Sequence, residues 1–314
     1  MLSQIFRQSV AIWLACLSHQ LMAQKGVDSI AVLQIGGIQQ VITLKGRDST
    51  KPLLLFLHGG PGNSVMHYAE KFTRRLQEHF IVVQWDQREV GKTLALNKSP
   101  RPLTVRHFEE DTHALIDTLL KRFNRPKLYL AGHSWGTHLG FYIAINNPEL
   151  LYAYLAICPM VNQLESEKII LRLMKEEAMR TRNQIATKEL SAVKIPFENG
   201  EQLYFHRKWL IEYMGSKAKI AKKTVEEWSS TWLPIFVEAS KQNLFEVAPE
   251  VKCPVYFFVG GNDFQTNSSI TENYYKKLKA PKKELFWFER SGHSLPTTEP
   301  EKLQRIIMGI RNKE

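Results

Sequence analysis

Cysteine is scarce in this sequence, and long apolar runs are missing from it. Three cysteines occur in 314 residues, with no C-x-x-C pair and no cysteine–histidine spacing of the kind that holds zinc. The sequence therefore predicts no metal site, and we expect no cofactor. No apolar run approaches the roughly 20 residues that a transmembrane helix needs, so no membrane span is expected. Internal repeats and low-complexity tracts are also absent from the sequence.

A long basic block is missing as well, although the formal net charge is +11. Lysine and arginine are scattered among glutamates, and no nucleic-acid recognition motif accompanies them, so we expect no nucleic-acid partner. What the sequence does have is a hydrophobic content of 44%, which is enough for a sizeable core. At about 150 residues per domain, the chain forms one large domain or two.

The first 23 residues have a character of their own. A basic residue precedes an apolar run at residues 10–17, and a polar break then leads to a short segment ending at Ala23. This order resembles a secretory signal peptide, so we expect residues 1–23 to be removed and the protein to be exported, to a periplasmic or extracellular location. A frayed or buried N-terminal segment is the alternative. A lipid anchor at Cys16 is disfavoured, because Trp13 is a poor first residue for a lipoprotein attachment box.

Short continuous apolar runs recur along the rest of the chain, as is typical of strands buried on both faces of a sheet. They lie at residues 53–57, 81–83, 128–131, 154–157, 255–259 and 285–288, after a predicted hairpin at residues 30–44 that is broken by Gly36-Gly37. Helical patterns separate several of them, for example at residues 105–123 behind the capping residue Thr104, and at residues 300–310. This alternation predicts an α/β fold with a mostly parallel sheet and helices on both faces.

Two cysteines fall at opposite ends of neighbouring predicted strands. Cys158 ends one strand and Cys253 begins the next. A parallel sheet would hold them farther apart than the ~7 Å limit on the Cα separation of a disulfide, so we expect both to be free.

The alternation of strands and helices fails at residues 161–250. This segment is rich in Glu, Lys, Arg, Trp and Leu at helical spacings and contains no strand-like run. It leaves the sheet at the carboxyl edge of the strands, where ligands bind in such folds. We therefore predict a helical cap, or lid, that divides the core into residues 24–160 and 251–314. A second helical domain with a role of its own is the alternative.

Ser134 lies where a strand pattern changes to a helix pattern. Gly132 and Gly136 flank it at the G-x-S-x-G spacing, and glycine permits the tight backbone turn that this change requires. Such a turn exposes the serine Oγ and places the free N–H groups of a helix N-terminus behind it. The alternative is a chance pentapeptide, so the interpretation depends on whether the serine has partners.

A nucleophilic serine needs a base and a carboxylate that orients the base. In hydrolases with this motif the chain order is Ser, then Asp or Glu, then His. Asp263 follows the predicted strand at residues 255–259, and His293 follows the one at residues 285–288. Taken singly, an Asp in a turn is usually a local cap and a lone His is usually structural. Together they predict a catalytic triad of Ser134, Asp263 and His293.

An oxyanion hole is also required, and two segments can supply its N–H groups. Trp135 follows the predicted nucleophile, so its N–H points into the site. The loop after the strand at residues 53–57 reads His-Gly-Gly-Pro-Gly, and we favour Gly60 as the second donor, with Gly59 as the alternative. We interpret His58 as a structural hydrogen-bonding residue rather than a second base, because one base suffices.

These motifs occur together: His-Gly-Gly-Pro-Gly at 58–62, Trp-Asp-Gln-Arg at 85–88 and Gly-His-Ser-Trp-Gly at 132–136, with Asp263 and His293 downstream. The combination resembles the proline iminopeptidase-like branch of the α/β-hydrolase fold, and it spans the core on both sides of the predicted cap. The resemblance implies a serine hydrolase that forms an acyl-enzyme and releases an N-terminal proline or another small residue from peptides. It also implies Ser134 as nucleophile, Asp263 as the orienting carboxylate and His293 as base.

Two departures bear on the substrate. Glu89 stands where the family pattern has glycine, which we expect to reshape a loop near the pocket. The cap also has no segment that matches the substrate-binding acids of the family. Candidates for binding the substrate ammonium are Glu165, Glu167, Glu226 and Glu227, although solvated helix faces would explain these residues equally well. A small peptide is therefore the first substrate hypothesis, and an ester or other acyl compound is the second. A non-catalytic binding protein on the same scaffold is disfavoured by the complete triad.

Overall fold

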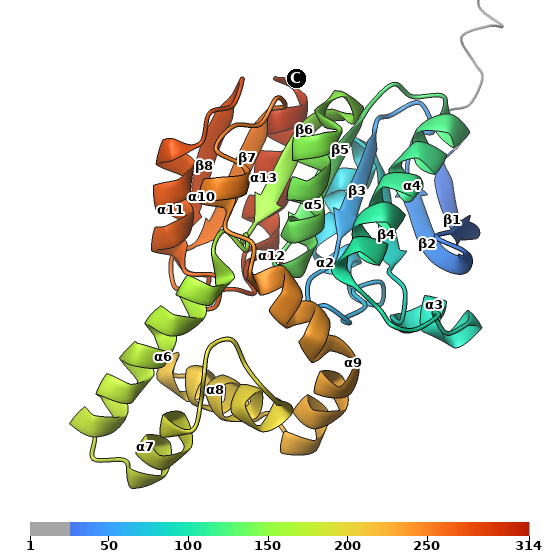
Figure 1. The fold of residues 1–314 in the computed structure, drawn as a ribbon. Helices are drawn as coiled ribbons and strands as arrows, with labels where there is room; N and C mark the ends of the chain where they lie inside the picture. Colours follow the sequence, from blue (N-terminus) through green and yellow to red (C-terminus); the bar gives the residue numbers. More distant parts are fainter. Residues whose placement is uncertain (1–25, 314) are drawn as a thin grey trace, which may run out of the picture.

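The computed structural model describes residues 26–313, and a single eight-stranded sheet organises them (Figure 1). In space the strand order is β1-β2-β4-β3-β5-β6-β7-β8. The strands are β1 (Val27–Ile35), β2 (Ile38–Gly46), β3 (Leu53–Leu57), β4 (Ile81–Asp86), β5 (Leu128–His133), β6 (Leu151–Ile157), β7 (Val255–Gly260) and β8 (Lys283–Phe288). Strand β2 runs antiparallel to both of its neighbours, and the remaining neighbouring pairs are parallel.

The predicted strands are confirmed, including the hairpin, in which Gly36 and Gly37 connect β1 to β2 with positive φ angles of 55° and 79°. All residues of β3, β4 and β7 are buried, as continuous apolar runs predict. Strand β8 differs, because five of its six residues are only half-buried. It forms one edge of the sheet, so one of its sides has no neighbouring strand.

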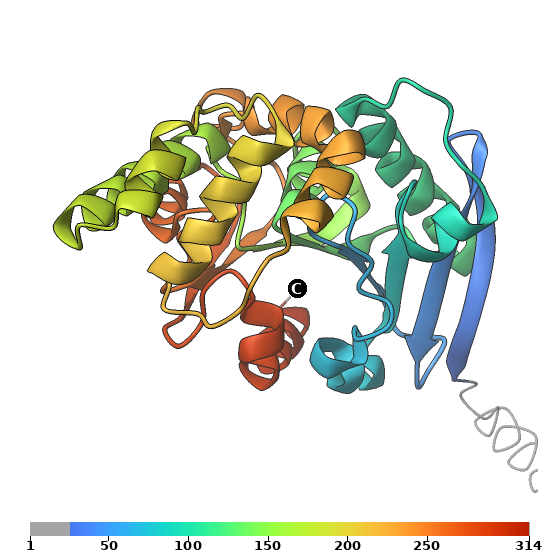
Figure 2. The ribbon, with the colours of Figure 1, turned by 90° about the horizontal axis from the view of Figure 1, so that it is seen from below.

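Helices cover both faces of the sheet (Figure 2). One face carries α2 (Glu70–Thr73), the 3₁₀ helix η1 (Arg74–Glu78), α12 (Leu295–Thr298) and α13 (Pro300–Arg311), and the other carries α4 (Val105–Phe123), α5 (Trp135–Asn146) and α11 (Ser268–Lys277). The short elements α3 (Gly91–Leu96), η2 (Pro148–Leu150) and α10 (Leu244–Val247) lie in connections. Helix α4 begins behind Thr104, whose side chain forms a capping box with His107.

Between β6 and β7 the chain forms the four cap helices, which lie beyond the carboxyl edge of the sheet (Figure 1). They are α6 (Gln163–Arg180), α7 (Gln184–Ser191), α8 (Gly200–Tyr213) and α9 (Lys222–Ser240). Asparagine side chains at Asn162, Asn183 and Asn199 accept a backbone hydrogen bond at the starts of α6, α7 and α8. The polar sequence of this segment therefore contains its own helix-start signals.

The cap is packed onto the core rather than tethered beside it. Buried cap residues such as Ile170, Leu210 and Phe236 belong to the same apolar cluster as Leu55 of β3 and Leu139 of α5. A second cluster fills the opposite face of the sheet, between the strands and helices α2 and α13. The cap therefore shares the apolar core beside the carboxyl ends of the strands.

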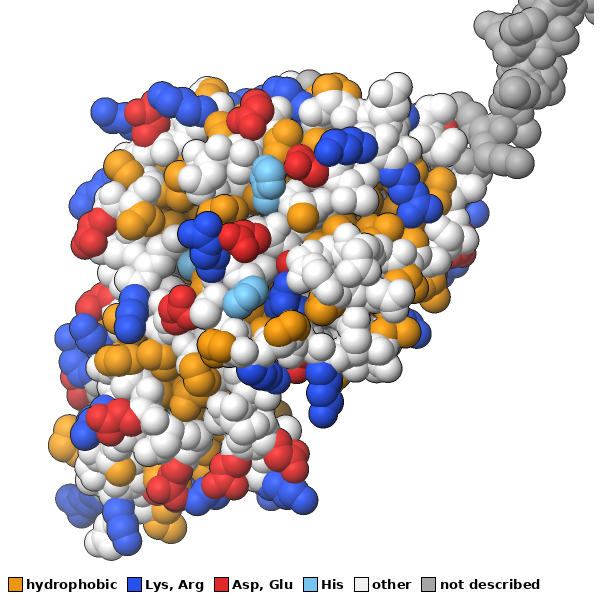
Figure 3. Space-filling view, turned by 45° about the vertical axis from the view of Figure 1, so that its right-hand side comes forward, with side chains coloured by type: hydrophobic (Ala, Val, Ile, Leu, Met, Phe, Trp, Pro, Cys, Tyr) orange, Lys and Arg blue, Asp and Glu red, His pale blue; other side chains and the backbone are white. Residues whose placement is uncertain are grey.

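Further sequence-based expectations concern the cysteines, the N-terminus, membrane spans and the surface charge. Cys158 and Cys253 are free, as predicted, and both are buried. The predicted signal peptide lies outside the described residues, so export stays a prediction. Among residues 26–313, no helix is long and apolar enough to span a membrane. On the face seen in Figure 3, basic and acidic side chains are interspersed.

Candidate active site

Ser134 occupies the sharp turn between β5 and α5. Its backbone has φ 52° and ψ −120°, and its N–H donates to the carbonyl oxygen of Ile157 at 3.0 Å. Such a conformation is costly for a residue with a side chain, and strained residues of this kind cluster at functional sites. The flanking glycines are needed because a side chain would clash at either position. A Cβ atom on Gly136 would lie 2.2 Å from the carbonyl oxygen of Leu57, and a Cβ atom on Gly132 would lie 2.5 Å from the carbonyl oxygen of Gly136.

The structure brings Ser134 together with the two residues predicted as its partners. Nε2 of His293 lies 2.9 Å from Oγ of Ser134, and Nδ1 of His293 lies 3.0 Å from Oδ2 of Asp263. The three residues follow β5, β7 and β8, at the carboxyl edge of the parallel sheet. Ser134 and His293, which lie 159 positions apart, therefore form one hydrogen-bonded chain with Asp263.

Asp263 is buried but well supplied with hydrogen-bond donors. Its Oδ1 accepts from the backbone N–H groups of Gln265 and Thr266, and its Oδ2 accepts from the Thr266 hydroxyl at 2.8 Å. Burial alone would raise the pKa of Asp263, but the His293 ring and the Thr266 hydrogen bonds outweigh burial and hold that pKa well below its usual range. The carboxylate is therefore ionised near neutral pH and can fix the orientation of His293.

The glycine-rich loop lies directly against the turn at Ser134. A Cβ atom on Gly59 would lie 3.3 Å from the Cβ of Ser134, and Gly60 has φ 127°, which side chains rarely adopt. Trp135 is the first residue of α5, where backbone N–H groups have no partner within the helix. The predicted oxyanion donors thus come from two segments that meet at Ser134.

His58 holds this loop in place. It is buried, its Nδ1–H donates to the carbonyl oxygen of Gly59 at 2.8 Å, and its Nε2 accepts from the N–H of Gln87 at 3.4 Å. Burial lowers the pKa of His58, so the ring is neutral near pH 7. Gln87 in turn accepts a 3.0 Å hydrogen bond from the indole of Trp135. These hydrogen bonds support a structural role for His58, and they link the three sequence motifs to one another.

Glu89 does not displace the backbone expected for glycine. It has φ 59°, within the left-handed region, so the chain keeps a glycine-like conformation at some cost in strain. The carboxylate of Glu89 accepts from the N–H of Ser99 at 2.6 Å and from Nη2 of Arg101 at 2.8 Å. The substitution therefore adds two contacts that hold the loop at residues 99–101.

The cap reaches the glycine-rich loop through two tryptophans of α9, which sequence reasoning missed. The indole N–H of Trp228 donates to the carbonyl oxygen of Pro61 at 2.8 Å. Trp232 lies so close to Gly62 that a Cβ atom there would be 2.5 Å from its Nε1. The two residues are four positions apart and so share a helix face, which was the available signal.

A cavity of about 340 Å³ lies between this loop and the cap. Gly60 and Asn63 border it on one side, and apolar residues of α8 and α9 such as Leu210 and Trp228 border it on the other. Arg207 is the one charged residue among its lining residues. The cavity borders the predicted oxyanion donor, which makes it the candidate substrate pocket.

The four candidate glutamates of the cap are placed very differently. Glu165 is exposed, and Glu226 and Glu227 are exposed on α9, 3.8 Å from Lys222 and Lys223 respectively. For these three the solvated-face interpretation is the better one. Glu167 is fully buried, and its two carboxylate oxygens accept from Nη2 and Nη1 of Arg207 at 2.5 and 2.8 Å.

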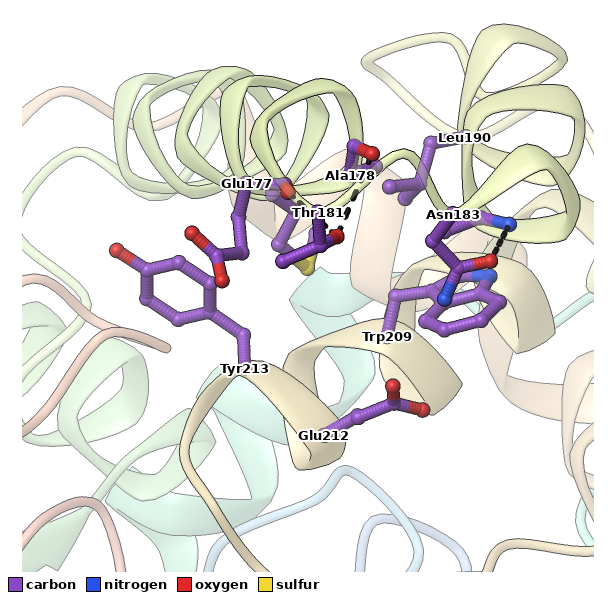
Figure 4. A pocket seen from close by; sticks show the side chains of 10 residues that line it. Glu177, Ala178, Thr181, Asn183, Leu190, Trp209, Glu212 and Tyr213 are labelled. Carbon is purple, nitrogen blue, oxygen red and sulfur yellow. Dashed lines mark hydrogen bonds between the residues drawn. The ribbon is translucent and has the colours of Figure 1, made fainter.

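A larger cavity of about 680 Å³ lies within the cap, between α6, α7 and α8. In Figure 4, Trp209, Glu212 and Tyr213 of α8 line it on one side, and Glu177 and Thr181 line it on another. The α8 residues that line it differ from those that line the cavity at Gly60, so the two cavities lie on different faces of α8.

Within residues 26–313, one group of side chains has ligand atoms close enough together to be considered for a metal: His133, Cys158 and His293, within 4.8 Å of one another. The two histidines are engaged elsewhere. His133 donates from Nε2 to the carbonyl oxygen of His293 at 2.9 Å, and His293 contacts Ser134. Burial raises the pKa of the Cys158 thiol well above its usual value, which disfavours the thiolate that metals bind. We assign no metal to this group.

The sheet order, the turn at Ser134 and the cap between β6 and β7 define an α/β hydrolase. Solved structures with this fold align over nearly the whole chain. An α/β hydrolase enzyme, MGS-M2, from a Medee basin deep-sea metagenome library matches with a TM-score of 0.61 at 16% identity, covering 90% of this chain and 98% of that one. The epoxide hydrolase VrEH1 of Vigna radiata matches with a TM-score of 0.57 at 19% identity, covering 91% and 98%. At these identities the likeness shows the fold alone.

Sequence comparison identifies the family. Residues 48–301 match the family model of serine aminopeptidase, S33, and the chain belongs to that family. A relative described as "Probable aminopeptidase YbaC", of Bacillus subtilis (strain 168), is 29% identical over 299 residues, which cover 88% of this chain and 94% of the relative. A "Proline iminopeptidase" of Heyndrickxia coagulans is 22% identical over 270 residues, covering 82% and 90%. The resemblance inferred from the motifs is thereby confirmed.

Proposed function

We propose that this protein is a serine hydrolase that releases N-terminal residues from peptides through an acyl-enzyme. The observation that carries the proposal is the hydrogen-bonded chain from Ser134 Oγ through His293 to Asp263. Membership of the serine aminopeptidase family and the similarity to the Bacillus subtilis relative support peptides as the substrates.

The proposed first step is attack of Ser134 on the carbonyl carbon of the N-terminal residue. A neutral hydroxyl is a weak nucleophile, so His293 accepts its proton through Nε2 as the Oγ–C bond forms. Asp263 accepts the Nδ1–H of His293, which keeps Nε2 free to act as the base and stabilises the imidazolium that results. Because the Asp263 pKa is lowered, its carboxylate remains ionised during this step.

Negative charge then develops on the carbonyl oxygen of the substrate. The N–H of Trp135 and the N–H of Gly60, or of Gly59, are assigned to stabilise it. Each such donor is worth roughly 3 kcal/mol in the transition state. His293 next gives its proton to the leaving amine as the C–N bond breaks, and Ser134 carries the acyl group. Water attacks this ester with His293 again as the base, which releases the amino acid and restores the serine.

One observation favours the second candidate, an esterase or other acyl hydrolase. Among the residues that line the cavity at Gly60, none is a carboxylate, and the one charged residue is the cation Arg207. An unmodified peptide N-terminus carries an ammonium group, for which this lining offers no free counter-charge. An ester substrate needs none.

The proposal is tested with a fluorophosphonate probe and a panel of substrates. The probe labels an activated serine whatever the substrate, and we expect peptide mapping to find the label on Ser134. Turnover is then compared, by kcat/KM, among aminoacyl arylamides and a short-chain ester. Labelling at another serine would refute the assigned nucleophile. Turnover of the ester with no arylamide cleaved would leave the acyl hydrolase as the function.

A further inference from the structure

The cavity at Gly60 is the place where an N-terminal residue would lie if the proposed function holds. It borders the loop at residues 58–62, and Gln265, whose N–H supports Asp263, also lines it. Apart from Asn63, Thr224, Gln265 and Arg207, its lining side chains are apolar, and Gly60 has none. The choice of substrate therefore depends strongly on the charge and the hydrogen-bond donors of Arg207.

Arg207 is held rigidly at the wall of this cavity. Its guanidinium lies 5.5 Å from the ring centroid of Phe197 and 5.9 Å from that of Phe236, and its side chain is 15% exposed. Behind it, Glu167 is 1% exposed and receives two hydrogen bonds from the guanidinium and one from Nε2 of Gln163. Paired and stacked in this way, the guanidinium is preorganised for recognition.

Not all donors of Arg207 are used within the protein. A guanidinium has five N–H groups. Within residues 26–313, Arg207 donates from Nη1 to Glu167 and to Nδ1 of His206, and from Nη2 to Glu167. The Nε–H and one N–H of Nη2 therefore remain for an acceptor outside this network.

The charge balance of the pair decides which substrates fit. Burial alone would raise the pKa of Glu167, but the charges and hydrogen bonds of Arg207 and its neighbours lower it, so the pair is ionised and neutral overall. The carboxylate is engaged behind the guanidinium, so an α-ammonium in the cavity would meet a cation first. An amide nitrogen carries no charge, and the carbonyl oxygen bonded to the same group could accept a hydrogen bond from the free N–H groups of Arg207.

We propose that the pocket selects peptides whose N-terminal nitrogen is acylated, with Arg207 donating to the oxygen of that acyl group. In such substrates the nitrogen is an amide, so it carries no charge and its carbonyl is an acceptor. A cyclic form, the five-membered lactam of pyroglutamate, and a linear form, an acetylated residue, share this chemistry. The inference rests on the proposed function and names its substrate class.

The wild-type enzyme provides the first test. Four arylamides with one leaving group are compared by kcat/KM: pyroglutamyl, N-acetylalanyl, prolyl and alanyl. We expect at least one acylated substrate to exceed both free amines by about ten-fold or more, the usual penalty for an unpaired charge or donor in a binding site. The two acylated substrates distinguish the lactam from the linear acyl group. An advantage below ten-fold, or a preference for a free amine, overturns the inference.

Two variants test Arg207 itself. Glu167→Gln/Arg207→Gln removes both charges together, so that no buried charge is left unpaired, and Arg207→Lys keeps a cation beside Glu167 but removes the planar fork. In each we expect the ratio of kcat/KM for acylated over free-amine substrates to fall by about ten-fold or more. An unchanged ratio in a variant that still labels at Ser134 overturns the role of Arg207.

A matched control comes from α6. Glu177 and Arg180 form an exposed pair with distances of 2.6 and 2.7 Å, and they do not line the cavity at Gly60. The Glu177→Gln/Arg180→Gln variant should keep the wild-type ratio. Fluorophosphonate labelling distinguishes a failure of the proposed function from a failure of the proposed substrate class. Loss of labelling at Ser134 in the wild type refutes the proposed function, whereas intact labelling with a free-amine preference refutes the substrate class alone.

Discussion

The indole N–H of Trp228, on cap helix α9, donates a hydrogen bond of 2.8 Å to the carbonyl oxygen of Pro61, the residue after Gly60. The same tryptophan lines the cavity at Gly60. One side chain therefore joins the cap, the candidate substrate pocket and the loop assigned to the oxyanion hole. The cap can be expected to influence the reaction step as well as substrate entry.

This contact yields the first prediction. Trp228→Phe keeps an aromatic ring but removes the donor, so the carbonyl of the buried Pro61 loses its partner and the loop at Gly60 is less firmly held. A hydrogen bond of this kind is worth about 0.5–1.5 kcal/mol, so kcat should fall by about two- to ten-fold. Steady-state kinetics on the best arylamide measures it.

Trp209→Phe is the matched control for this prediction. It also removes an indole hydrogen bond from a cap helix, here the 2.7 Å bond from Trp209 to Glu189. Because Trp209 faces the other cavity of the cap, kcat should remain within about two-fold of wild type. Equal losses in both variants would mean that general destabilisation of the cap, and not the Pro61 contact, controls the rate.

The second prediction concerns Ser134, the proposed nucleophile. Ser134→Ala removes Oγ and should lower kcat by about a thousand-fold or more, because only binding and the oxyanion donors remain. The positive φ of 52° penalises any residue with a Cβ, so serine and alanine bear the same strain and thermal stability should change little. Fluorophosphonate labelling and thermal unfolding measure the two effects. Retained labelling would contradict the assignment.

The juxtaposition of Ser134, Asp263 and His293 was predictable because each residue follows an apolar run. Runs of that kind form parallel strands, and the carboxyl ends of parallel strands meet at one edge. The prediction therefore needed only the order of the strands along the chain and not their order in space. The burial of β8 was overestimated, since an apolar run does not reveal which strand forms the edge of a sheet.

The side-chain pairing within the cap could not be predicted in the same way. Glu167 and Arg207 lie 40 residues apart on α6 and α8, and neither position has a pattern that separates it from solvated charges nearby. Their pairing depends on how the two helices cross, which is a tertiary property. Likewise, Glu89 suggested a reshaped loop, whereas the structure retains the left-handed backbone and adds contacts to Ser99 and Arg101.

Glu89 provides the third prediction. Glu89→Ala removes the two hydrogen bonds but keeps the backbone strain that a Cβ atom causes at φ 59°. Glu89→Gly removes the hydrogen bonds and the strain. The glycine variant should therefore be the more stable of the two, by about 1 kcal/mol, and both should be less stable than wild type if the contacts outweigh the strain. Denaturant unfolding of the three proteins measures this. An alanine variant as stable as the glycine variant would show that the backbone at residue 89 relaxes.

The last prediction concerns acid stability and His206. Burial, aided by the neighbouring Arg207 and opposed by Glu167, lowers the pKa of His206 from 6.5 to about 4, and its Nδ1 lies 2.8 Å from Nη1 of Arg207. The unfolded chain therefore takes up a proton at this residue as the pH falls below about 6.5, while the folded protein does so only near pH 4. The unfolded state binds more protons between these values, so the free energy of unfolding falls as the pH is lowered through this window. Each such proton contributes a slope of up to about 1.4 kcal/mol per pH unit.

In the His206→Gln variant, residue 206 takes up no proton in either the folded or the unfolded state. Its free energy of unfolding should consequently depend less steeply on pH between 4 and 6.5, by up to about 1.4 kcal/mol per unit, even if the variant is less stable at pH 7. His133, whose pKa burial also lowers to about 4, stays in place, so part of the wild-type slope should remain. Urea unfolding at four pH values between 4.5 and 7.5 gives both slopes. A His206→Gln variant with the full wild-type slope would mean that His206 takes up its proton at the same pH in the folded protein as in the unfolded chain, and that burial does not hold the ring neutral.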